Sequence, residues 1–466
     1  MMKKALLIST LIVFCMTLCH AQMEIKIQIT PTHYDTLKIE SFHPDKKQIV
    51  SFTQPFGAEV TFKDKQSLQP GFYWIIGDTT KVGSFLISNN KNQKFTVIIS
   101  EDTVIYQGSV ENTRNVEYIS HIQGFRRQLA ALDQEFASAQ ASMPQYMLRV
   151  LADSLTAKAR RINKAQDDYQ IAVSKENSGL LLGSIVELAR SIPEMPQEYY
   201  QNRELYQKFV LEHYFDHFPW NDPRIFKTPI GDDKIKDFCN IIYQLDRKDL
   251  DTFVVAALNA ARVNEQSLYL FYDKVEKILG SNISPYKVEH TYIKMLQNIL
   301  SYPNLDKNRQ RRCSRELGMI NKNLEGDQVP NFRIVMGNGD TTSLYDIQCD
   351  YMLLYLQHPT CPTCREVRGK MANYPALNSA IAKKNLTVLT VYFEDDAQVW
   401  ANYLKSSEAN SSYLHGWNFD QSIEDNQLYD TRTIPYMFLL DKDKKVIRKD
   451  LLYNEIEDYI KQLRLN

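Results

Sequence analysis

The chain has 466 residues, carries 55 Lys and Arg residues against 56 Asp and Glu residues, and has a formal net charge of −1. It is too long for one hydrophobic core, so about two to four domains are expected. The even charge balance gives no reason to expect nucleic-acid binding or electrostatic attraction to a membrane surface.

Residues 1–21 have the pattern of a secretory signal peptide. A charged start is followed by an apolar run over residues 5–18 and by Ala21 at a small-residue cleavage position. An uncleaved anchor is one alternative, although the run is shorter than the roughly 20 residues of a membrane span. Lipidation of Cys15 or Cys19 is another, but neither cysteine follows a small residue. We therefore expect export to the periplasm, where disulfides persist.

Five cysteines remain after such a cleavage, so at least one thiol is unpaired within a monomer. Cys239, Cys313 and Cys349 are widely spaced in helical or apolar surroundings, which is typical of buried, unreactive cysteines. A bridge between Cys239 and Cys313 is an open alternative. The other two cysteines, Cys361 and Cys364, have Cys-x-x-Cys spacing.

Residues 22–110 carry the pattern of short β-strands. Residues 24–29 alternate strictly between apolar and polar, and short apolar or aromatic runs predict strands at 71–76, 83–87 and 94–99. Short strands at this spacing favour a small antiparallel β-sandwich. The segment has no paired acids, no metal-ligand spacing and no phosphate-binding loop, so we interpret it as a scaffold or interaction domain.

Residues 111–325 change to helical periodicity and predict an irregular all-α domain without a fixed repeat. Apolar residues recur at three- and four-residue steps from Val116 to Val173, which predicts a long helix or two antiparallel helices broken near Pro144. The same pattern predicts further helices at residues 179–192, 199–217, 233–245, 249–262, 267–279, 285–300 and 306–323.

His213 and His217 have the spacing of two ligands on one helix face. A catalytic zinc helix also carries a Glu directly after the first His and needs a third ligand, whereas here Tyr214 follows His213. We interpret the stretch as aromatic helix packing and predict no metal site.

The strongest chemical signal is Cys361-Pro362-Thr363-Cys364, in the C-terminal region 326–466. An apolar strand at residues 351–356 precedes the motif and a helical pattern follows it, a context that favours a redox pair over a zinc knuckle. Cys361 would be the N-cap and Pro362 the first helical residue. The unpaired N–H groups and the dipole of the helix would stabilise a thiolate at Cys361. We therefore predict that Cys361 attacks and that Cys364 resolves; a static disulfide is the alternative.

The same region is predicted to be α/β, with strand, helix and strand followed by a hairpin and a last helix, which is the thioredoxin order. Three motifs resemble the TlpA/ResA-type thioredoxin-like proteins, which are exported thiol:disulfide oxidoreductases. The first runs from Gly326 to Phe332 and contains Val-Pro-Asn-Phe, the second is the Cys-Pro-Thr-Cys motif, and the third is Thr433-Ile434-Pro435.

The resemblance implies that the Ile434–Pro435 peptide is cis, faces the cysteines and offers its backbone to a substrate beside Thr360, Pro362 and Thr363. It further implies a protein or small-molecule disulfide or dithiol as substrate, a membrane electron donor, and no organic cofactor. The order of a β domain, a helical domain and this domain is also similar to multidomain periplasmic TlpA-like proteins. The oligomeric state is not predicted.

Three positions depart from the family pattern. The tryptophan that often precedes the first cysteine is Thr360, and the usual acids fall on Val367 and Tyr355. A resolving thiol needs a base, because only the thiolate attacks. Lys370, Glu394 or a water molecule are the substitutes that the sequence offers.

Together these features predict an exported thiol:disulfide oxidoreductase that reduces protein disulfides through Cys361 and Cys364. The alternative hypothesis is a non-catalytic thioredoxin-like binding protein of the cell envelope, whose β and helical domains form the working surface.

Overall fold

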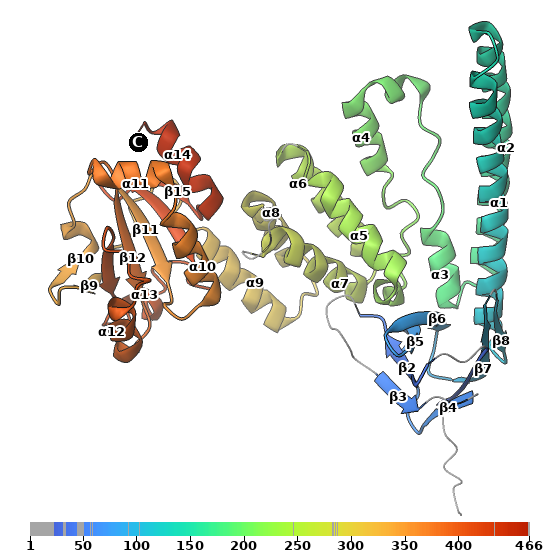
Figure 1. Cartoon of the computed structure of the whole chain (residues 1–466), viewed down its shortest axis with the longest axis horizontal. Helices are drawn as coiled ribbons and strands as arrows, with labels where there is room; N and C mark the ends of the chain where they lie inside the picture. The colour runs from blue at the N-terminus through green and yellow to red at the C-terminus, as the bar shows by residue number, and fades with distance from the viewer. Residues whose placement is uncertain are drawn as a thin grey trace, which may run out of the picture. The chain divides into compact units, whose positions relative to one another are not determined.

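The protein is described here by a computed structural model, in which the chain divides into two compact units, Met1–Val275 and Glu276–Asn466 (Figure 1). The predicted signal peptide at residues 1–21 and Thr433 lie outside the described residues. Among the described residues, no helix has the length and hydropathy needed to cross a bilayer. The described residues are 23–30, 34–43, 51–55, 57, 59–91, 93–101, 103–245, 247–281, 284, 286, 288–432 and 434–464.

The first unit begins with two four-stranded sheets that share one core. Their orders are β4-β1-β7-β8 and β3-β2-β5-β6. Alternate residues of β1 are buried, and Ile25 and Ile27 pack in one cluster with Ile39, Ile75 and Phe85 of the other sheet. The strands are β1 Met23–Thr30, β2 Thr36–Ser41, β3 Ser51–Pro55, β4 Glu59–Asp64, β5 Gly71–Gly77, β6 Thr80–Ile87, β7 Gln93–Ser100 and β8 Val104–Gln107.

This arrangement confirms the predicted β-sandwich but corrects the expectation that it is antiparallel throughout. Strands β1 and β7 pair in parallel, from Met23 opposite Gln93 to Thr30 opposite Ser100. Five strands separate them in the chain, and a parallel pair needs such a crossover because a tight hairpin joins only antiparallel strands.

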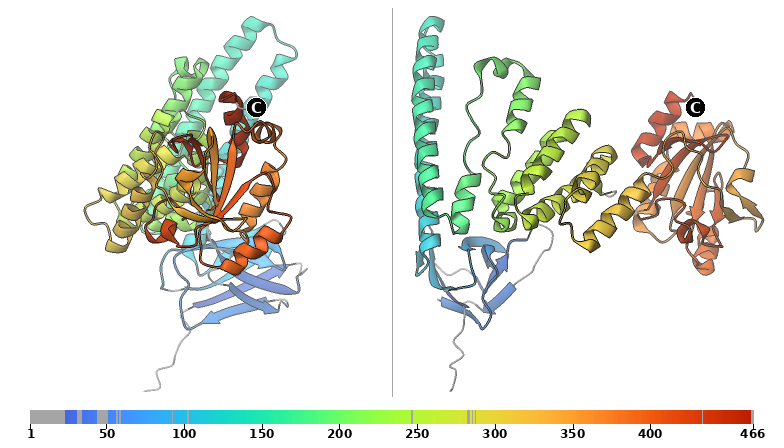
Figure 2. Two further views of the ribbon diagram at one scale, coloured as in Figure 1. Left: turned by 90° about the vertical axis from the view of Figure 1, so that its left-hand side faces the viewer. Right: turned by 180° about the vertical axis from the view of Figure 1, so that it is seen from behind.

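The rest of the first unit is helical. Helices α1 and α2 run side by side (Figures 1 and 2), and Pro144 is the N-cap of α2, as the break in the sequence pattern predicts. The elements are α1 Val110–Gln140, α2 Gln145–Glu176, α3 Leu181–Leu188, η1 Gln197–Gln201, α4 Arg203–Glu212, η2 Pro223–Lys227, α5 Pro229–Ile242, α6 Arg247–Ala261 and α7 Glu265–Val275.

Buried polar groups tie the start of α1 to the sandwich. The Asn112 side chain accepts from Leu86 N–H at 2.7 Å and donates to Leu86 C=O at 3.0 Å. Glu111 accepts from the Ser88 hydroxyl at 2.6 Å and from Leu182 N–H at 3.0 Å. Each buried group therefore has the partner that burial requires.

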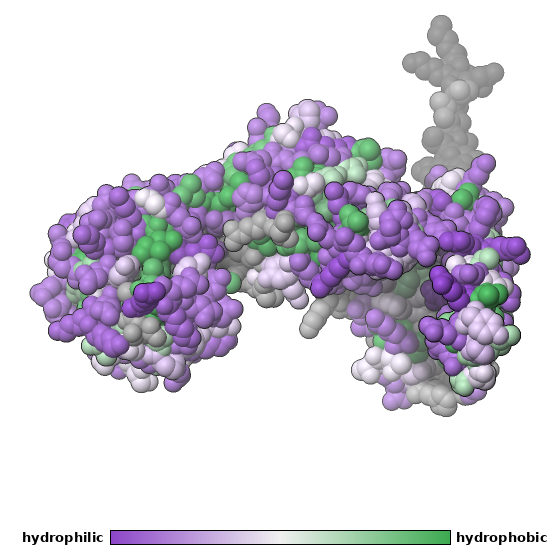
Figure 3. Space-filling model, turned by 90° about the horizontal axis from the view of Figure 1, so that it is seen from above, coloured by the Kyte–Doolittle hydropathy of each residue, from purple (hydrophilic) through white to green (hydrophobic). Residues whose placement is uncertain are grey.

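Some apolar side chains of the helical region face solvent. Tyr146 and Val150, near the start of α2, are 70% and 69% exposed. Figure 3 shows one face of the molecule, on which hydrophilic side chains predominate and hydrophobic ones form small groups. Scattered groups of this kind are normal for a protein surface.

The second unit contains three helical elements followed by an α/β domain. The helical elements are the π-helical turn η3 Glu276–Gly280, α8 Glu289–Leu300 and α9 Lys307–Ile320. The domain's elements are β9 Arg333–Met336, β10 Thr341–Ser343, η4 Leu344–Asp346, β11 Tyr351–Gln357, α10 Pro362–Met371, α11 Pro375–Ala382, β12 Thr387–Tyr392, α12 Ala397–Lys405, β13 Leu414–Trp417, α13 Ser422–Asp425, β14 Tyr436–Asp441, β15 Val446–Lys449, η5 Tyr453–Glu455 and α14 Ile456–Gln462.

A seven-stranded mixed sheet in the order β10-β9-β13-β12-β11-β14-β15 organises the domain. Strand β11 lies inside the sheet between β12 and β14 and is buried on both faces. Its residues Leu354 and Leu356 pack on one side with Phe438, whereas Leu353 and Tyr355 pack on the other. Val367 of α10, Leu377 of α11 and Ile456 of α14 lie in that second cluster. The predicted order of β, all-α and α/β regions is confirmed.

Candidate active site

The two cysteines lie at the turn from β11 into α10. Cys361 is the N-cap of α10, with an extended backbone, and Pro362 is its first residue. The turn is closed by hydrogen bonds from Cys361 N–H to His358 C=O (3.1 Å) and from Arg365 N–H to Cys361 C=O (3.0 Å). Proline suits this position because it has no N–H to leave unpaired.

The two sulfur atoms face each other but have different surroundings. Both cysteines are unbridged; Cys361 is partly exposed and Cys364 is fully buried. Burial raises the pKa of the Cys364 thiol to about 12, and its hydrogen bond with the Cys361 side chain acts in the same direction. The His358 backbone and the Arg368 charge oppose this rise. The inner thiol is therefore protonated at neutral pH.

Tyr355 and Arg368 line the buried side of the pair. The Tyr355 hydroxyl donates to Cys364 C=O at 3.0 Å. Arg368 is buried and donates to the Gln357 side chain, to Pro359 C=O at 3.1 Å and to Glu408 at 2.5 Å. The buried charge nearest the motif in sequence is thus a cation. Arg368 had no predicted role, although its place four residues after Cys364 puts it one helical turn away.

His358 on the same turn pairs with Glu394, which follows the neighbouring strand β12. The Nδ1 atom of His358 is 3.2 Å from Thr360 N–H and 3.0 Å from the Thr360 hydroxyl. Because a backbone N–H only donates, Nδ1 accepts, and in the neutral ring the proton resides on Nε2. His358 Nε2 is 3.3 Å from Glu394 Oε2. Glu394 was among the predicted substitutes for the missing acids, whereas His358 had no predicted role.

Lys370, another predicted substitute for the missing acids, is already bound to other side chains. Its amine donates to Glu366 at 2.6 Å and to the Tyr453 hydroxyl at 3.1 Å. These bonds raise the pKa of Lys370 and favour the cation, so Lys370 is a poor proton acceptor.

The loop before β14 lies at the same end of the sheet's strands as the cysteine turn. The Ile434–Pro435 peptide is cis, which confirms the prediction. Tyr436 pairs with Leu356 at the end of β11 that leads into the turn with Thr360, Pro362 and Thr363. The register thus brings Ile434 and Pro435 to the end of the sheet that carries Cys361. Cys361, Cys364 and the cis peptide therefore form one candidate site.

Comparison with known families adds to this geometry. Residues 348–446 match the family model described as thioredoxin-like. The C-terminal domain is thioredoxin-like. Residues 155–323 match a domain of unknown function, DUF5106. A comparison with curated proteins gives no match to this chain.

Solved structures show the same likeness. A thioredoxin-like protein from Bacteroides caccae is 27% identical, with a TM-score of 0.53, over 58% of this chain and 98% of its own. The C-terminal domain of an uncharacterized protein from Bacteroides fragilis is 29% identical over 30% of this chain and 98% of its own, with a TM-score of 0.29. A thiol-disulfide oxidoreductase from Bacteroides fragilis is 22% identical over 29% and 99%, with a TM-score of 0.26.

Among the described cysteines outside the Cys-Pro-Thr-Cys motif, none forms a bridge. Cys239 and Cys313 are both buried and are not bonded to each other, so the alternative of a bridge between them is wrong for this structure. Burial raises the pKa of Cys239 to about 12, which agrees with the predicted unreactive thiol. Cys349 is partly exposed, and burial raises its pKa as well.

The expectation that His213 and His217 share one helix is wrong. Helix α4 ends at Glu212 and His213 is its C-cap, so the chain leaves the helix before His217. His213 Nδ1 lies 2.6 Å from Asp216, and His217 Nδ1 lies 3.4 Å from Glu187. Each imidazole thus has a carboxylate of its own.

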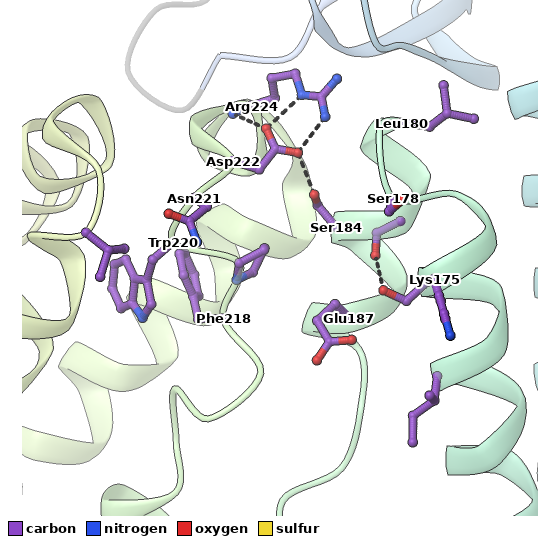
Figure 4. Close-up of a pocket in the computed structure, with 15 residues that line it drawn as sticks. Lys175, Ser178, Leu180, Ser184, Glu187, Phe218, Trp220, Asn221, Asp222 and Arg224 are labelled. Carbon is purple, nitrogen blue, oxygen red and sulfur yellow. Dashed lines mark hydrogen bonds and ion pairs between the residues drawn. The ribbon is translucent and has the colours of Figure 1, made fainter.

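The first unit contains a hollow of about 740 Å³, and none of the residues that line it is a cysteine (Figure 4). Phe218 and Trp220 form part of its wall. Asp222 binds the Ser184 hydroxyl at 2.5 Å and the guanidinium of Arg224 at 2.7 Å. These polar groups are satisfied by one another, so they give the hollow no evident chemistry.

Proposed function

We propose that this protein is an exported thiol:disulfide oxidoreductase of the TlpA/ResA type that acts as a reductase in the periplasm. The observation that carries the proposal is the pairing of a partly exposed N-cap sulfur with a buried sulfur at the sheet edge that also bears the cis peptide. The thioredoxin-like fold of the domain supports it.

The reaction has two exchange steps. The Cys361 thiolate attacks one sulfur of a substrate disulfide, an S–S bond forms between them, and the other substrate sulfur leaves as a thiolate that takes up a proton. Cys364 then loses its proton and attacks the Cys361 sulfur, which releases the second substrate thiol. The substrate gains two electrons and the cysteine pair becomes a disulfide. A membrane electron donor would reduce the pair again.

The second step needs a proton acceptor, because the pKa of Cys364 is raised to about 12. His358 lies on the turn that carries Cys361, and its Nε2 atom is 3.3 Å from Glu394, which follows β12. Both ring nitrogens of neutral His358 are already engaged, so we propose that the Glu394 carboxylate accepts the Cys364 proton through a water molecule. Arg368 supports the step electrostatically, because its charge favours the Cys364 thiolate.

Reduction of insulin by dithiothreitol-treated protein tests the proposal. Cys361→Ser should abolish the catalysed rate, whereas Cys239→Ala, which removes a buried thiol of the other unit, should retain it. Cys364→Ser should accumulate a covalent complex with the substrate that dithiothreitol releases. Equal rates for the wild type and Cys361→Ser would refute an oxidoreductase.

The second candidate is a binding protein of the cell envelope that uses the thioredoxin-like fold without catalysis. One observation favours it: Tyr355 and Val367 occupy the positions where the resembled family has acids. This function predicts stable complexes that survive replacement of both Cys361 and Cys364. Loss of every captured partner in the double variant would exclude it.

A further inference from the structure

A basic hollow lies beside the loop that carries the cis peptide. Its volume is about 470 Å³, and all its walls belong to the second unit. One face of helix α9 and Arg432 line it, with Asn308, Arg311, Arg312, Arg315 and Glu316 as the α9 residues. Four guanidinium groups and one carboxylate thus surround a small space.

The sequence of α9 puts its cations on one side of the helix. Asn308, Arg311, Arg312 and Arg315 follow one another at steps of three, one and three residues, so they share one face of the helix. Arg311 and Arg315 are four residues apart, and like charges at this spacing repel each other. A helix with this pattern gains stability when an anion binds to that face.

Two of the four cations are neutralised within the unit. Arg312 lies 2.9 Å from Glu276 and 3.2 Å from Glu316. Arg432 binds Asp430 through two nitrogens, at 2.7 Å and 2.6 Å.

The other two cations have no carboxylate partner. Arg311 donates only to the neutral oxygens of Asn308, at 2.7 Å, and Lys307, at 3.4 Å. Within the described part of the chain, Arg315 has neither a hydrogen bond nor an ion pair, and its side chain is exposed. The hollow therefore contains two positive charges that no carboxylate neutralises.

The position of Arg432 connects this hollow to the candidate active site. Arg432 precedes Ile434 by two residues, and Tyr436 pairs with Leu356 at the end of β11 that leads to Cys361. A substrate segment held along the cis-peptide loop would reach Arg432 within a few residues of its reacting sulfur, since extended chain covers about 3.3 Å per residue.

We propose that the hollow binds a carboxylate side chain of the disulfide substrate, so that the enzyme prefers cystines flanked by acidic residues. This inference rests on the proposed function and adds its substrate class. Guanidinium groups hold carboxylates through paired, charge-assisted N–H···O bonds, which suits Arg311 and Arg315.

Two matched peptides test the inference with the full-length protein. Both contain the same cystine, flanked by Glu residues in one peptide and by Gln residues in the other. The wild type should reduce the Glu peptide with a kcat/KM about fivefold higher at low salt, as expected for two exposed ion pairs. The advantage should shrink as ionic strength rises, because salt screens exposed charges.

Two double variants separate the hollow from overall charge. Arg311→Gln with Arg315→Gln should bring the two rate constants to a ratio near one. Lys383→Gln with Lys405→Gln removes the same charge from exposed residues that do not line the hollow, and should keep the fivefold preference. If the arginine double variant fails to fold, the single change Arg315→Gln at an exposed site serves instead.

The outcomes distinguish this inference from the proposed function. If the wild type reduces insulin, and reduces the Glu and Gln peptides at equal rates, the inference is wrong but the proposed oxidoreductase activity is supported. If it reduces neither insulin nor the peptides, the oxidoreductase falls together with the inference. Inorganic phosphate provides the last test. If phosphate protects the wild type against unfolding but the wild type shows no preference for the Glu peptide, the hollow is a small-anion site and the proposal is overturned.

Discussion

The hollows of the two units differ in how their polar side chains are paired. In the first unit, Asp222 and Arg224 line a large hollow and bind each other, and the buried Glu111 binds Ser88 and Leu182. In the hollow of the second unit, Arg311 and Arg315 have no carboxylate partner, and in the same unit the Cys361 sulfur is partly exposed. Polar groups that satisfy one another stabilise a fold, whereas those left open can act on a ligand.

The sharpest way to test this contrast is thiol labelling. In native, reduced protein at pH 8, iodoacetamide should modify the partly exposed Cys361 far faster than Cys364 or Cys239. With their pKa values raised to about 12, only about one of these buried thiols in ten thousand is ionised at pH 8. Because a raised pKa makes the thiolate scarce below it, labelling of Cys364 in Cys361→Ser should rise with pH toward 12. Mass spectrometry of the peptides measures both, and equal rates at pH 8 would contradict the assignment.

The buried hydrogen-bond networks of the first unit predict a large decrease in the free energy of unfolding when one acceptor is removed. Glu111→Ala leaves the Ser88 hydroxyl and Leu182 N–H without their acceptor, at a cost of about 2–4 kcal/mol in the free energy of unfolding. Urea unfolding followed by circular dichroism checks this. Glu117→Ala, at an exposed position of the same helix, should change little. Identical midpoints for the two variants would show that the network contributes nothing.

Arg368 is a buried cation close to the cysteine pair, and its loss should slow resolution. Its charge lowers the pKa of Cys364, so Arg368→Met raises that pKa further and leaves less thiolate to attack. A change of about one pKa unit would slow release of the mixed disulfide about tenfold. Arg368→Lys keeps the charge and should recover part of the rate. Stopped-flow reduction of insulin measures resolution, and an unchanged rate in Arg368→Met would remove Arg368 from the mechanism.

Glu394→Gln should have the smallest effect, because the exposed Glu394 carboxylate reaches Cys364 only through a water molecule. We expect a decrease of a few fold in the resolution rate, from the loss of one exposed charged partner. Asp395→Asn, at an exposed neighbouring acid, is the matched control. An equal decrease in both variants would indicate a general charge effect.

In the C-terminal domain, local pattern predicted most of the strands but missed one strand of the seven-stranded sheet. Residues 414–417, Leu-His-Gly-Trp, have a weak strand pattern of their own, yet they form β13. Pairing with β12 on one side and with β9 on the other makes them a strand. The same limit applies to residues 213–217, where helical spacing continued past the end of α4.

The cysteine turn could be inferred from eleven neighbouring residues, since N-cap, proline and strand are adjacent in the chain. The cis peptide came from a family resemblance. The partners of the site could not be inferred: Arg368 meets Glu408 and His358 meets Glu394 across long separations in sequence. The separation in sequence between the unpaired cations of α9 and Arg432 is larger still.

Amino-acid order alone therefore decides where the reactive sulfur lies and which helix begins beside it, because capping and strand patterns act over a few residues. Folding decides which charges surround that sulfur, how deeply its partner is buried, and whether an arginine finds a carboxylate. Burial and Coulomb energies depend on distances in space, and these link residues that the chain itself keeps far apart.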